Sequence, residues 1–262
     1  MSLPTPSIQE FHASGKLVVH RFFSDDEVLA MQLEVARWLN EGMFRDVSTN
    51  PAVQNLQCIP LHPRSTLFQV LSRTTKVVSA VQNLVGSPIV KILDQSFYKP
   101  AHSGIATSWH TDNAYFQMSD PLGGLAMWIA IHDASRENGC LKVLPNAFNK
   151  TFAHCRDPLS DHHIRTEIHD KDALYCELEA GGVVFFCFGT PHATGDNTTD
   201  QPRAGVGIHY VNTTRMDGLN AERWQQLDKS DSRSSSEGDV EFSTLVQETI
   251  SRGSAHLKPQ EY

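Results

Sequence analysis

From Ile89 onward the sequence is a succession of short apolar or alternating runs, and this feature limits the possible fold most. The runs cover 89–98, 105–110, 124–132, 140–145, 174–178, 182–188 and 204–211, and Gly, Pro, Asn or Asp ends each of them. Short strands at this spacing, with no long helices between them, favour an antiparallel sandwich or barrel over a parallel sheet. The sequence therefore predicts a mainly β fold with flanking helices.

Before this β-rich part, the sequence predicts two helices. Ser24 and Glu27 form a capping box that begins the first helix, which is expected to end near residue 42. The second helix is expected from about residue 66 to 84, where a glycine and a proline follow. Between the two helices, 43–64 is expected to be a loop because its three prolines interrupt any regular element. A short strand is expected at 17–19.

The chain is expected to form a single domain of 262 residues. Residues 1–88 would be helical support, 89–212 the β core, and 213–262 a polar C-terminal segment that is partly mobile. Within the core, 146–173 is polar and is expected to be a long loop of the kind that covers binding sites. A last short helix is possible at 240–250.

Composition and charge exclude several classes of protein. The chain has 22 basic and 30 acidic residues, and its net charge of −8 argues against nucleic acid and anionic membranes as partners. Its five cysteines never form a Cys-x-x-Cys pair, so zinc-finger and disulfide-scaffold classes are not expected. No signal-peptide pattern and no apolar run long enough for a transmembrane helix is present. We expect a cytoplasmic protein that is a monomer or a homodimer.

A His-x-Asp triplet, His110-Thr111-Asp112, precedes a single histidine, His192, by 82 positions counted from His110. Two imidazoles and one carboxylate are the ligand set that holds non-haem Fe(II) while leaving positions open. In a β-strand, residues i and i+2 point to the same side, so His110 and Asp112 could reach one metal ion together. A polar surface loop is the alternative explanation of the triplet taken alone.

The segment around His192 favours the metal site. A glycine turn leads into the apolar run 182–188, and His192 follows directly, at a place where a rigid strand can present it. Arg203 stands 11 residues later and begins the next strand. The planar guanidinium binds a carboxylate with two parallel hydrogen bonds, which suits a dicarboxylate ligand.

Together these motifs resemble the phytanoyl-CoA dioxygenase family of Fe(II)- and 2-oxoglutarate-dependent oxygenases. The match covers roughly residues 88–212, and the pair Lys99-Pro100 also fits. Four segments carry the resemblance in order: Trp109–Phe116, Glu137–Pro145, His192–Asn197 and Arg203.

The resemblance implies a double-stranded β-helix, a cupin-like jelly roll, forming one oxygenase domain. It implies Fe(II), 2-oxoglutarate as co-substrate and O2. His110, Asp112 and His192 would be the iron ligands and the catalytic centre. Arg203 would bind the distal carboxylate of 2-oxoglutarate, and the co-substrate pocket would also include Thr194, Trp128, Gln95 and Thr107. Candidate residues of the substrate pocket are Lys99, Asn113, Tyr115, Phe148 and Asn197.

The expected reaction is hydroxylation of an unactivated C–H bond of a small-molecule metabolite, with release of succinate and CO2. Asp112 favours hydroxylation over halogenation, because related halogenases lack this carboxylate. The sequence departs from the family after Pro145, where Asn146-Ala147-Phe148 stands in place of the usual Gly-Ser/Thr-His, so the substrate of the best-known members is not carried over. Two alternatives stay open: desaturation, epimerisation or ring formation at the same iron centre, and a metal-binding jelly-roll module without catalysis.

Overall fold

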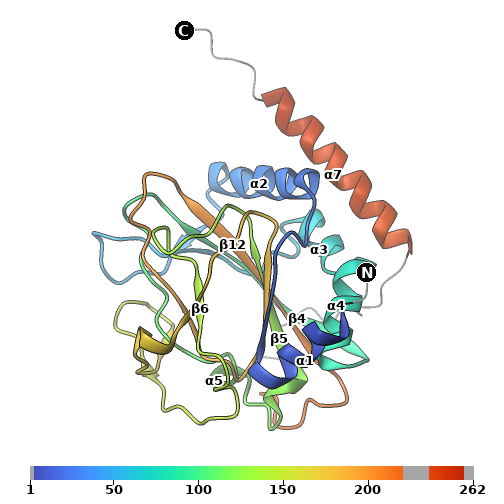
Figure 1. Ribbon diagram of the computed structural model, residues 1–262. Helices are drawn as coiled ribbons and strands as arrows, with labels where there is room; N and C mark the ends of the chain where they lie inside the picture. Colours follow the sequence, from blue (N-terminus) through green and yellow to red (C-terminus); the bar gives the residue numbers. More distant parts are fainter. Residues whose placement is uncertain (1–2, 221–235, 257–262) are drawn as a thin grey trace.

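The computed structural model describes residues 3–220 and 236–256, with side chains up to residue 253. It is a sandwich of one large and one small antiparallel sheet, with helices packed against the outer face of the large sheet (Figure 1). The large sheet has seven strands in the order β1-β10-β5-β12-β4-β3-β2. Its strands are β1 (Lys16–Val19), β10 (Val183–Cys187), β5 (Gly124–Ala130), β12 (Arg203–Asn212), β4 (Ile89–Lys99), β3 (Leu56–Cys58) and β2 (Arg45–Asp46).

The small sheet lies over the inner face of the large one. It consists of β11 (His192–Thr194), β6 (Leu141–Val143) and β9 (Leu174–Cys176), in that order. Side chains of β5 alternate between the two faces, because successive residues of a strand point to opposite sides. Leu125, Met127 and Ile129 pack in the core beneath the helices. Ala126, Trp128 and Ala130 pack against the small sheet.

The helices are amphipathic elements that cover the large sheet (Figure 1). They are α1 (Thr5–Ser14), α2 (Asp25–Asn40), α3 (Thr66–Leu71), α4 (Thr75–Val85) and α7 (Ser236–His256). The short helix α5 (Asn113–Phe116) lies at the bottom of the view in Figure 1, away from α2. The capping box expected at the start of α2 is confirmed, since Ser24 N donates to Glu27 Oε2 at 2.7 Å. Met31, Val35 and Trp38 of α2 are buried in the core.

The N-terminal region departs from the expectation in two places. The segment 43–64 is not only a loop, because it supplies β2 and β3 to the edge of the large sheet. These strands have two and three residues, which is too short to produce a readable alternation. The helix expected at 66–84 is two helices, α3 and α4. Between them Thr74 leaves the helical conformation and caps the end of α3 through its hydroxyl, which donates to Leu71 O at 2.9 Å. The strand expected at 17–19 is confirmed as part of β1.

The expected loop 146–173 contains a two-stranded ribbon, β7 (Cys155–Arg156) and β8 (Ile164–Arg165), and a 3-10 turn, η2 (Asp170–Asp172). A second turn of this kind, η1 (Pro121–Gly123), precedes β5. The run 105–110 forms no regular strand and contributes only a single bridge, His110 to His192. The segment nevertheless runs beside β11, because Thr194 N donates to Thr107 O at 3.0 Å and His110 and His192 exchange backbone hydrogen bonds.

The C-terminal segment ends in α7, which is longer than the expected helix at 240–250. It packs against α2, and its residues Phe242 and Val246 are buried. Within the segment 213–262, which was expected to be partly mobile, residues 221–235 and 257–262 lie outside the described residues. The single-domain organisation stays a prediction. In the described parts of the chain, no helix is long and apolar enough to cross a lipid bilayer.

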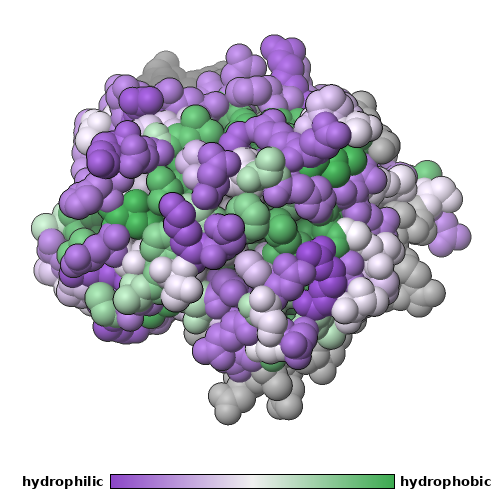
Figure 2. All heavy atoms as spheres, turned by 60° about the horizontal axis from the view of Figure 1, so that its bottom comes forward, coloured by the Kyte–Doolittle hydropathy of each residue, from purple (hydrophilic) through white to green (hydrophobic). Residues whose placement is uncertain are grey.

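The side of the molecule that is at the bottom in Figure 1 has a mostly hydrophilic surface (Figure 2). Apolar residues show there mainly in the gaps between polar side chains. Among the described residues, five large hydrophobic side chains are exposed, and one of them, Ile59, lines the main cavity. Most of the large apolar side chains are therefore buried, and some of them line this cavity.

Candidate metal centre and co-substrate pocket

His110 and His192 are brought together by two backbone hydrogen bonds. His110 N donates to His192 O at 3.0 Å, and His192 N donates to His110 O at 2.9 Å. His192 begins β11, whereas His110 lies in an otherwise irregular segment. This reciprocal pair fixes the two rings side by side, with their centroids 4.2 Å apart.

The tautomer of each histidine follows from its second ring nitrogen. Nδ1 of His110 lies 2.8 Å from Ser108 O, and Nδ1 of His192 lies 3.0 Å from Thr190 O. A carbonyl oxygen only accepts hydrogen bonds, so both Nδ1 atoms carry the proton. The lone pairs on Nε2 are left for a metal ion, and this carbonyl-oriented arrangement is the usual one for metal-ligating histidines.

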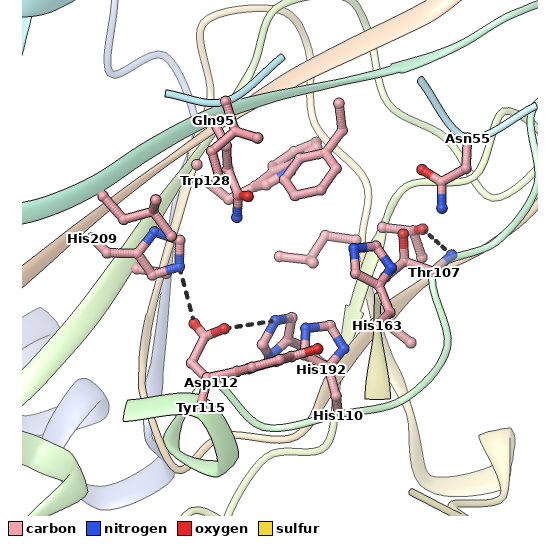
Figure 3. A pocket seen from close by; sticks show the side chains of 18 of the residues that line it. Asn55, Gln95, Thr107, His110, Asp112, Tyr115, Trp128, His163, His192 and His209 are labelled. Atoms are coloured by element: carbon pink, nitrogen blue, oxygen red, sulfur yellow. Dashed lines mark hydrogen bonds and ion pairs between the residues drawn. The ribbon is translucent and has the colours of Figure 1, made fainter. Parts of the chain in front are cut away.

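Asp112 completes the cluster from the start of a helix. It precedes α5, and its backbone is helical, with φ −60° and ψ −32°. Its Oδ1 lies 3.7 Å from His192 Nε2 (Figure 3). One ligand atom from each of His110, Asp112 and His192 lies within 4.8 Å of the other two. The expected strand across His110 and Asp112 is not present. A β-bridge at His110 and the start of α5 at Asp112 bring the two side chains together instead.

The electrostatics of the cluster suit a cation. Burial, together with the neighbouring His192, lowers the pKa of His110 to about 3. Burial also lowers the pKa of His192. For Asp112, burial raises the pKa, but the nearby His192 and His209 outweigh it and hold the pKa below its usual value. At neutral pH the cluster therefore presents two neutral imidazoles and one carboxylate.

A cavity of about 170 Å³ adjoins the cluster, and Arg203 reaches it from the first position of β12. The Arg203 side chain is fully buried, and burial lowers its pKa to about 10. One terminal nitrogen donates to Gly139 O, while Nε and the other terminal nitrogen have no partner among the described residues. The guanidinium carbon lies 5.5 Å from the centre of the Trp128 ring. A buried cation with two unsatisfied donors is a binding site for an anion.

Two features of the backbone let Arg203 take this place. Gly205 follows it on the same face of β12, and a Cβ there would lie 2.5 Å from the Trp128 ring. Gly139, whose carbonyl accepts from Arg203, has φ +79°, and a Cβ there would lie 2.3 Å from Gly195 O. The glycines therefore allow the close approach of the indole and of two loops.

Lys99 lies opposite Arg203 in the register of β4 and β12 and is also buried. Its Nζ donates to Ile105 O. Burial, and then the neighbouring Arg203, lower its pKa well below the usual value. Thr107 and Thr194 lie in the same part of the cavity, where Thr107 N donates to Thr194 Oγ1 at 2.9 Å.

The structure places most of the candidate residues on this one cavity. Besides the residues described above, its lining includes Gln95, Trp128 and Tyr115 (Figure 3). Three candidates lie elsewhere. Asn113 bonds the backbone of Met118, and Phe148 lies in a separate cleft. Asn197 is buried in a loop, where its amide donates to Lys99 O, Pro100 O and Gln201 O.

Two features of this cavity were missed in the sequence. His209 is buried with Nε2 3.2 Å from Asp112 Oδ2 (Figure 3). The signal was available, since Arg203 and His209 are six residues apart in one strand and so share a face. The other feature is the polar pair Asn55 and His163, which line the cavity from segments expected to be loops.

The fold and the site define a β-sandwich with a two-histidine, one-carboxylate centre beside an anion pocket. The family model described as phytanoyl-CoA dioxygenase matches residues 11–205. The chain therefore belongs to the phytanoyl-CoA dioxygenase family. It is similar to the ectoine dioxygenase of Bordetella bronchiseptica, with 24% identity over 232 residues, covering 80% of this chain and 75% of the relative.

A mouse protein, phytanoyl-CoA dioxygenase domain-containing protein 1 of Mus musculus, is 28% identical over 161 residues, covering 58% of this chain and 55% of the relative. Among solved structures, EctD from S. alaskensis with 2-oxoglutarate and 5-hydroxyectoine is similar, with a TM-score of 0.67 and 19% identity, covering 81% and 77% of the two chains. The carbocyclase SnoK from nogalamycin biosynthesis has a TM-score of 0.68 and 18% identity, covering 80% and 84%. These likenesses confirm the expected fold class, a cupin-like jelly roll with flanking helices.

Proposed function

We propose that the protein is an Fe(II)- and 2-oxoglutarate-dependent dioxygenase that hydroxylates an unactivated C–H bond of a small-molecule metabolite. One observation carries the proposal: a His-Asp-His cluster with converging ligand atoms lies on the same cavity as a buried arginine with two unsatisfied donors. A metal-binding module without catalysis would not need the buried arginine. Family membership supports the same class of enzyme.

His110, Asp112 and His192 would hold the iron. Both imidazoles present Nε2 with a lone pair, and Asp112 presents Oδ1, so these three residues would supply the ligands and leave the ion able to bind further groups. All three residues line the cavity, so such groups would bind there. Asp112 keeps the carboxylate that a halide would have to replace, which favours hydroxylation over halogenation.

Arg203 would bind the distal carboxylate of 2-oxoglutarate through its two unsatisfied donors. Thr194 and Lys99 would add donors to the same carboxylate, since both line this part of the cavity. Trp128 would cover the co-substrate, and Gln95 and Thr107 would border it. Binding this carboxylate gives the buried Arg203 guanidinium the opposite charge that it lacks, so the unfavourable free energy of burying it is offset only in the complex.

With iron, 2-oxoglutarate and dioxygen bound, the chemistry available is insertion of one oxygen atom into a C–H bond while the other oxidises 2-oxoglutarate to succinate and CO2. The residues of this chain hold the reactants in place and exclude water from a largely apolar cavity. Tyr115 lines the cavity beside His110 and would face the substrate.

The substrate is proposed to be a small molecule, as the name ectoine dioxygenase indicates for several relatives. Desaturation, epimerisation and ring formation diverge from hydroxylation only after the first hydrogen is removed. The solved structures of a carbocyclase and an epimerase share the fold alone, so they favour none of these outcomes. Mass spectrometry of the product separates them, because only hydroxylation adds one oxygen atom.

Succinate formation tests the proposal. Anaerobic addition of Fe(II) and 2-oxoglutarate to the wild-type protein is expected to give a weak visible charge-transfer band, and aerobic incubation is expected to give succinate. His110→Ala should abolish both, and His20→Ala, which changes an exposed histidine outside the cavity lining, should leave both intact. Unchanged succinate formation in His110→Ala would show that the metal centre is assigned to the wrong residues.

The oligomeric state, the compartment and the partners of the enzyme are also part of the proposal. We propose a cytoplasmic monomer or homodimer without nucleic acid or a membrane as partner, and the net charge of −8 supports the absence of these anionic partners. Sedimentation of the purified protein measures the oligomeric state directly.

A further inference from the structure

Three polar side chains form a chain on one wall of the cavity, and neither the iron site nor the co-substrate site uses them. Asn55 and His163 line the cavity, and Gln57 of β3 lies behind them, nearly fully buried. His162, the next residue to His163, is exposed and also lines the cavity, as does exposed Ile59. The wall therefore lies on the side where the cavity opens to solvent.

The hydrogen bonds of this chain have a definite direction. Gln57 Nε2 lies 3.3 Å from Asn55 Oδ1 and 3.0 Å from His163 Nε2. An amide nitrogen only donates, so Asn55 Oδ1 and His163 Nε2 are both acceptors. Burial, together with His162, lowers the pKa of His163 to about 4, so its ring is neutral at pH 7. The proton of His163 is therefore on Nδ1.

Nδ1 of His163 is buried and has no hydrogen-bond partner among the described residues. The Oδ1 atom of Asn55 is already used by Gln57, so the amide group of Asn55 has its Nδ2 donor left for the cavity. Buried donors in native proteins nearly always have a partner, and an unmatched one in a binding cavity points to an acceptor on the ligand. Figure 3 shows Asn55 and His163 on the same side of the cavity, with His163 nearer than Asn55 to the His-Asp-His cluster.

The rest of the lining limits the charge of the ligand. Among the described residues that line the cavity, the only carboxylate is Asp112 and the basic side chains other than histidine are Lys99 and Arg203. The proposed iron and 2-oxoglutarate sites use all three. Much of the rest of the lining is aromatic or aliphatic and includes Ile59, Leu93, Phe97, Tyr98 and Phe116. A charged substrate would find no opposite charge there, and burying it unpaired would be unfavourable.

We propose that His163 and Asn55 recognise the substrate by donating hydrogen bonds to an oxygen acceptor, such as a carbonyl, on a compact and otherwise apolar, uncharged molecule. Gln57 is a positioning residue, because it acts by fixing the tautomer of His163. The inference rests on the proposed function, since it identifies the class of substrate for that same site. A substrate held at this wall is also adjacent to the cluster, as reaction at a C–H bond requires.

The first test measures the tautomer. Protein loaded with Zn(II) and 2-oxoglutarate is diamagnetic and does not react with dioxygen, so nitrogen-15 NMR of its histidine rings is possible. The His163 signals, assigned by their loss in His163→Phe, are expected to show the Nδ1–H tautomer at pH 7. In Gln57→Leu this preference is expected to weaken. The Nε2–H tautomer in the wild-type protein would overturn the proposal.

The second test compares two ligands of the same shape, cyclohexanone and methylenecyclohexane, which differ in having C=O or C=CH2. The ketone is expected to bind the same Zn(II)–2-oxoglutarate form more tightly than the alkene. In His163→Phe the ketone should lose about five- to tenfold in affinity, the value of one neutral hydrogen bond, while the alkene should not. A ketone that binds no more tightly than the alkene, or equally well to both proteins, would overturn the proposal.

Gln57→Leu keeps the test decisive if His163→Phe does not fold, because Gln57 is outside the lining and its replacement should weaken ketone binding alone. Succinate formation by the wild-type Fe(II) enzyme is measured on the same preparation. Its absence would contradict the proposed function. Its presence together with equal binding of the two ligands would contradict only the recognition by His163 and Asn55.

Discussion

The two ends of the cavity are built on opposite principles. At the metal end, His110 and His192 come from segments 82 positions apart and meet at one isolated bridge, while Asp112 stands at a helix start. At the cation end, Lys99 and Arg203 are paired neighbours on β4 and β12, whose antiparallel pairing runs from Arg203–Lys99 to Asn212–Ile89. One end is assembled from irregular backbone and the other from the most extended strand pairing in the described sheets.

The difference follows from the charges that each end must hold. The metal end gathers neutral rings around a carboxylate, and a bound cation would tie the three segments together. The cation end places Lys99 and Arg203 side by side in a buried environment, which disfavours the charged form of both groups until an anion arrives. The paired strands hold the two basic side chains in place before the anion binds. The cation end is therefore preorganised for binding, at some cost to the stability of the fold.

The largest effect is expected from Arg203→Met, which tests the cation end. The KM for 2-oxoglutarate should rise by at least about thirtyfold, because truncating one partner of a buried charge pair costs about 2–5 kcal/mol. The metal-free protein without 2-oxoglutarate should become more stable, by on the order of 1 kcal/mol, since a poorly paired buried cation is removed. Steady-state kinetics and urea unfolding measure the two quantities.

Arg252→Met is the matched control, because it removes an exposed arginine on α7. It should change neither the KM nor the stability measurably. If Arg203→Met left the KM for 2-oxoglutarate unchanged, the co-substrate carboxylate would have to bind elsewhere in the cavity.

A smaller effect is expected at the metal end from His209, which lies 3.2 Å from the second oxygen of Asp112. We expect it to hold Asp112 so that only Oδ1 faces the metal. His209→Phe should weaken Co(II) binding by about ten- to a hundredfold, the usual effect of losing such a partner of a metal ligand. His209→Gln keeps a donor and should recover part of the affinity. Equal losses in the two variants would argue for packing rather than for the contact with Asp112.

The smallest expected effect concerns how the stability of the folded protein depends on pH, which should differ between the metal end and the cation end. The pKa of His110 is lowered to about 3 in the folded protein, whereas an unfolded histidine has a pKa of about 6.5. Below pH 6.5 the unfolded chain binds the extra proton, so stability is full above this pH and is lost as pH falls toward 3. The loss is at most about 1.4 kcal/mol per pH unit for this one group.

Urea unfolding of the metal-free protein at pH 7, 6 and 5 measures this slope. His110→Asn should reduce it, while Arg203→Met should not, because the Arg203 pKa of about 10 lies far above this range. A slope that responds to Arg203 and not to His110 would reverse the comparison between the two ends.

The sequence predicted the parts of the fold that depend on long alternating patterns. β4, β5, β10 and β12 were readable because each is longer than four residues and alternates or is wholly apolar. β2, β3, β7 and β8 were not readable, since two or three residues define no period. The break between α3 and α4 was also missed, because a threonine in a helical pattern gives no signal of its capping contact with Leu71.

For the site, motif spacing was more informative than local geometry. His110, Asp112, His192 and Arg203 were named from their order and spacing, and the structure brings all four to one cavity. The reason given for the triplet, strand alternation, was wrong. Asn113 and Asn197 were named because they lie within the segments that resemble the family, but their amides donate to backbone carbonyls. His163 could not have been found, because only the folded ribbon of β7 and β8 carries it to Gln57.

The reciprocal backbone bonds between His110 and His192 make these two amides natural reporters of iron occupancy. Each amide hydrogen can exchange with solvent only when the bridge opens, and opening the bridge also separates two ligands of the metal. Occupancy should therefore slow exchange at both positions together, by the factor by which the ion favours the closed form. Amide exchange at residues 110 and 192 thus offers a measure of metal binding that needs neither a chromophore nor a substrate.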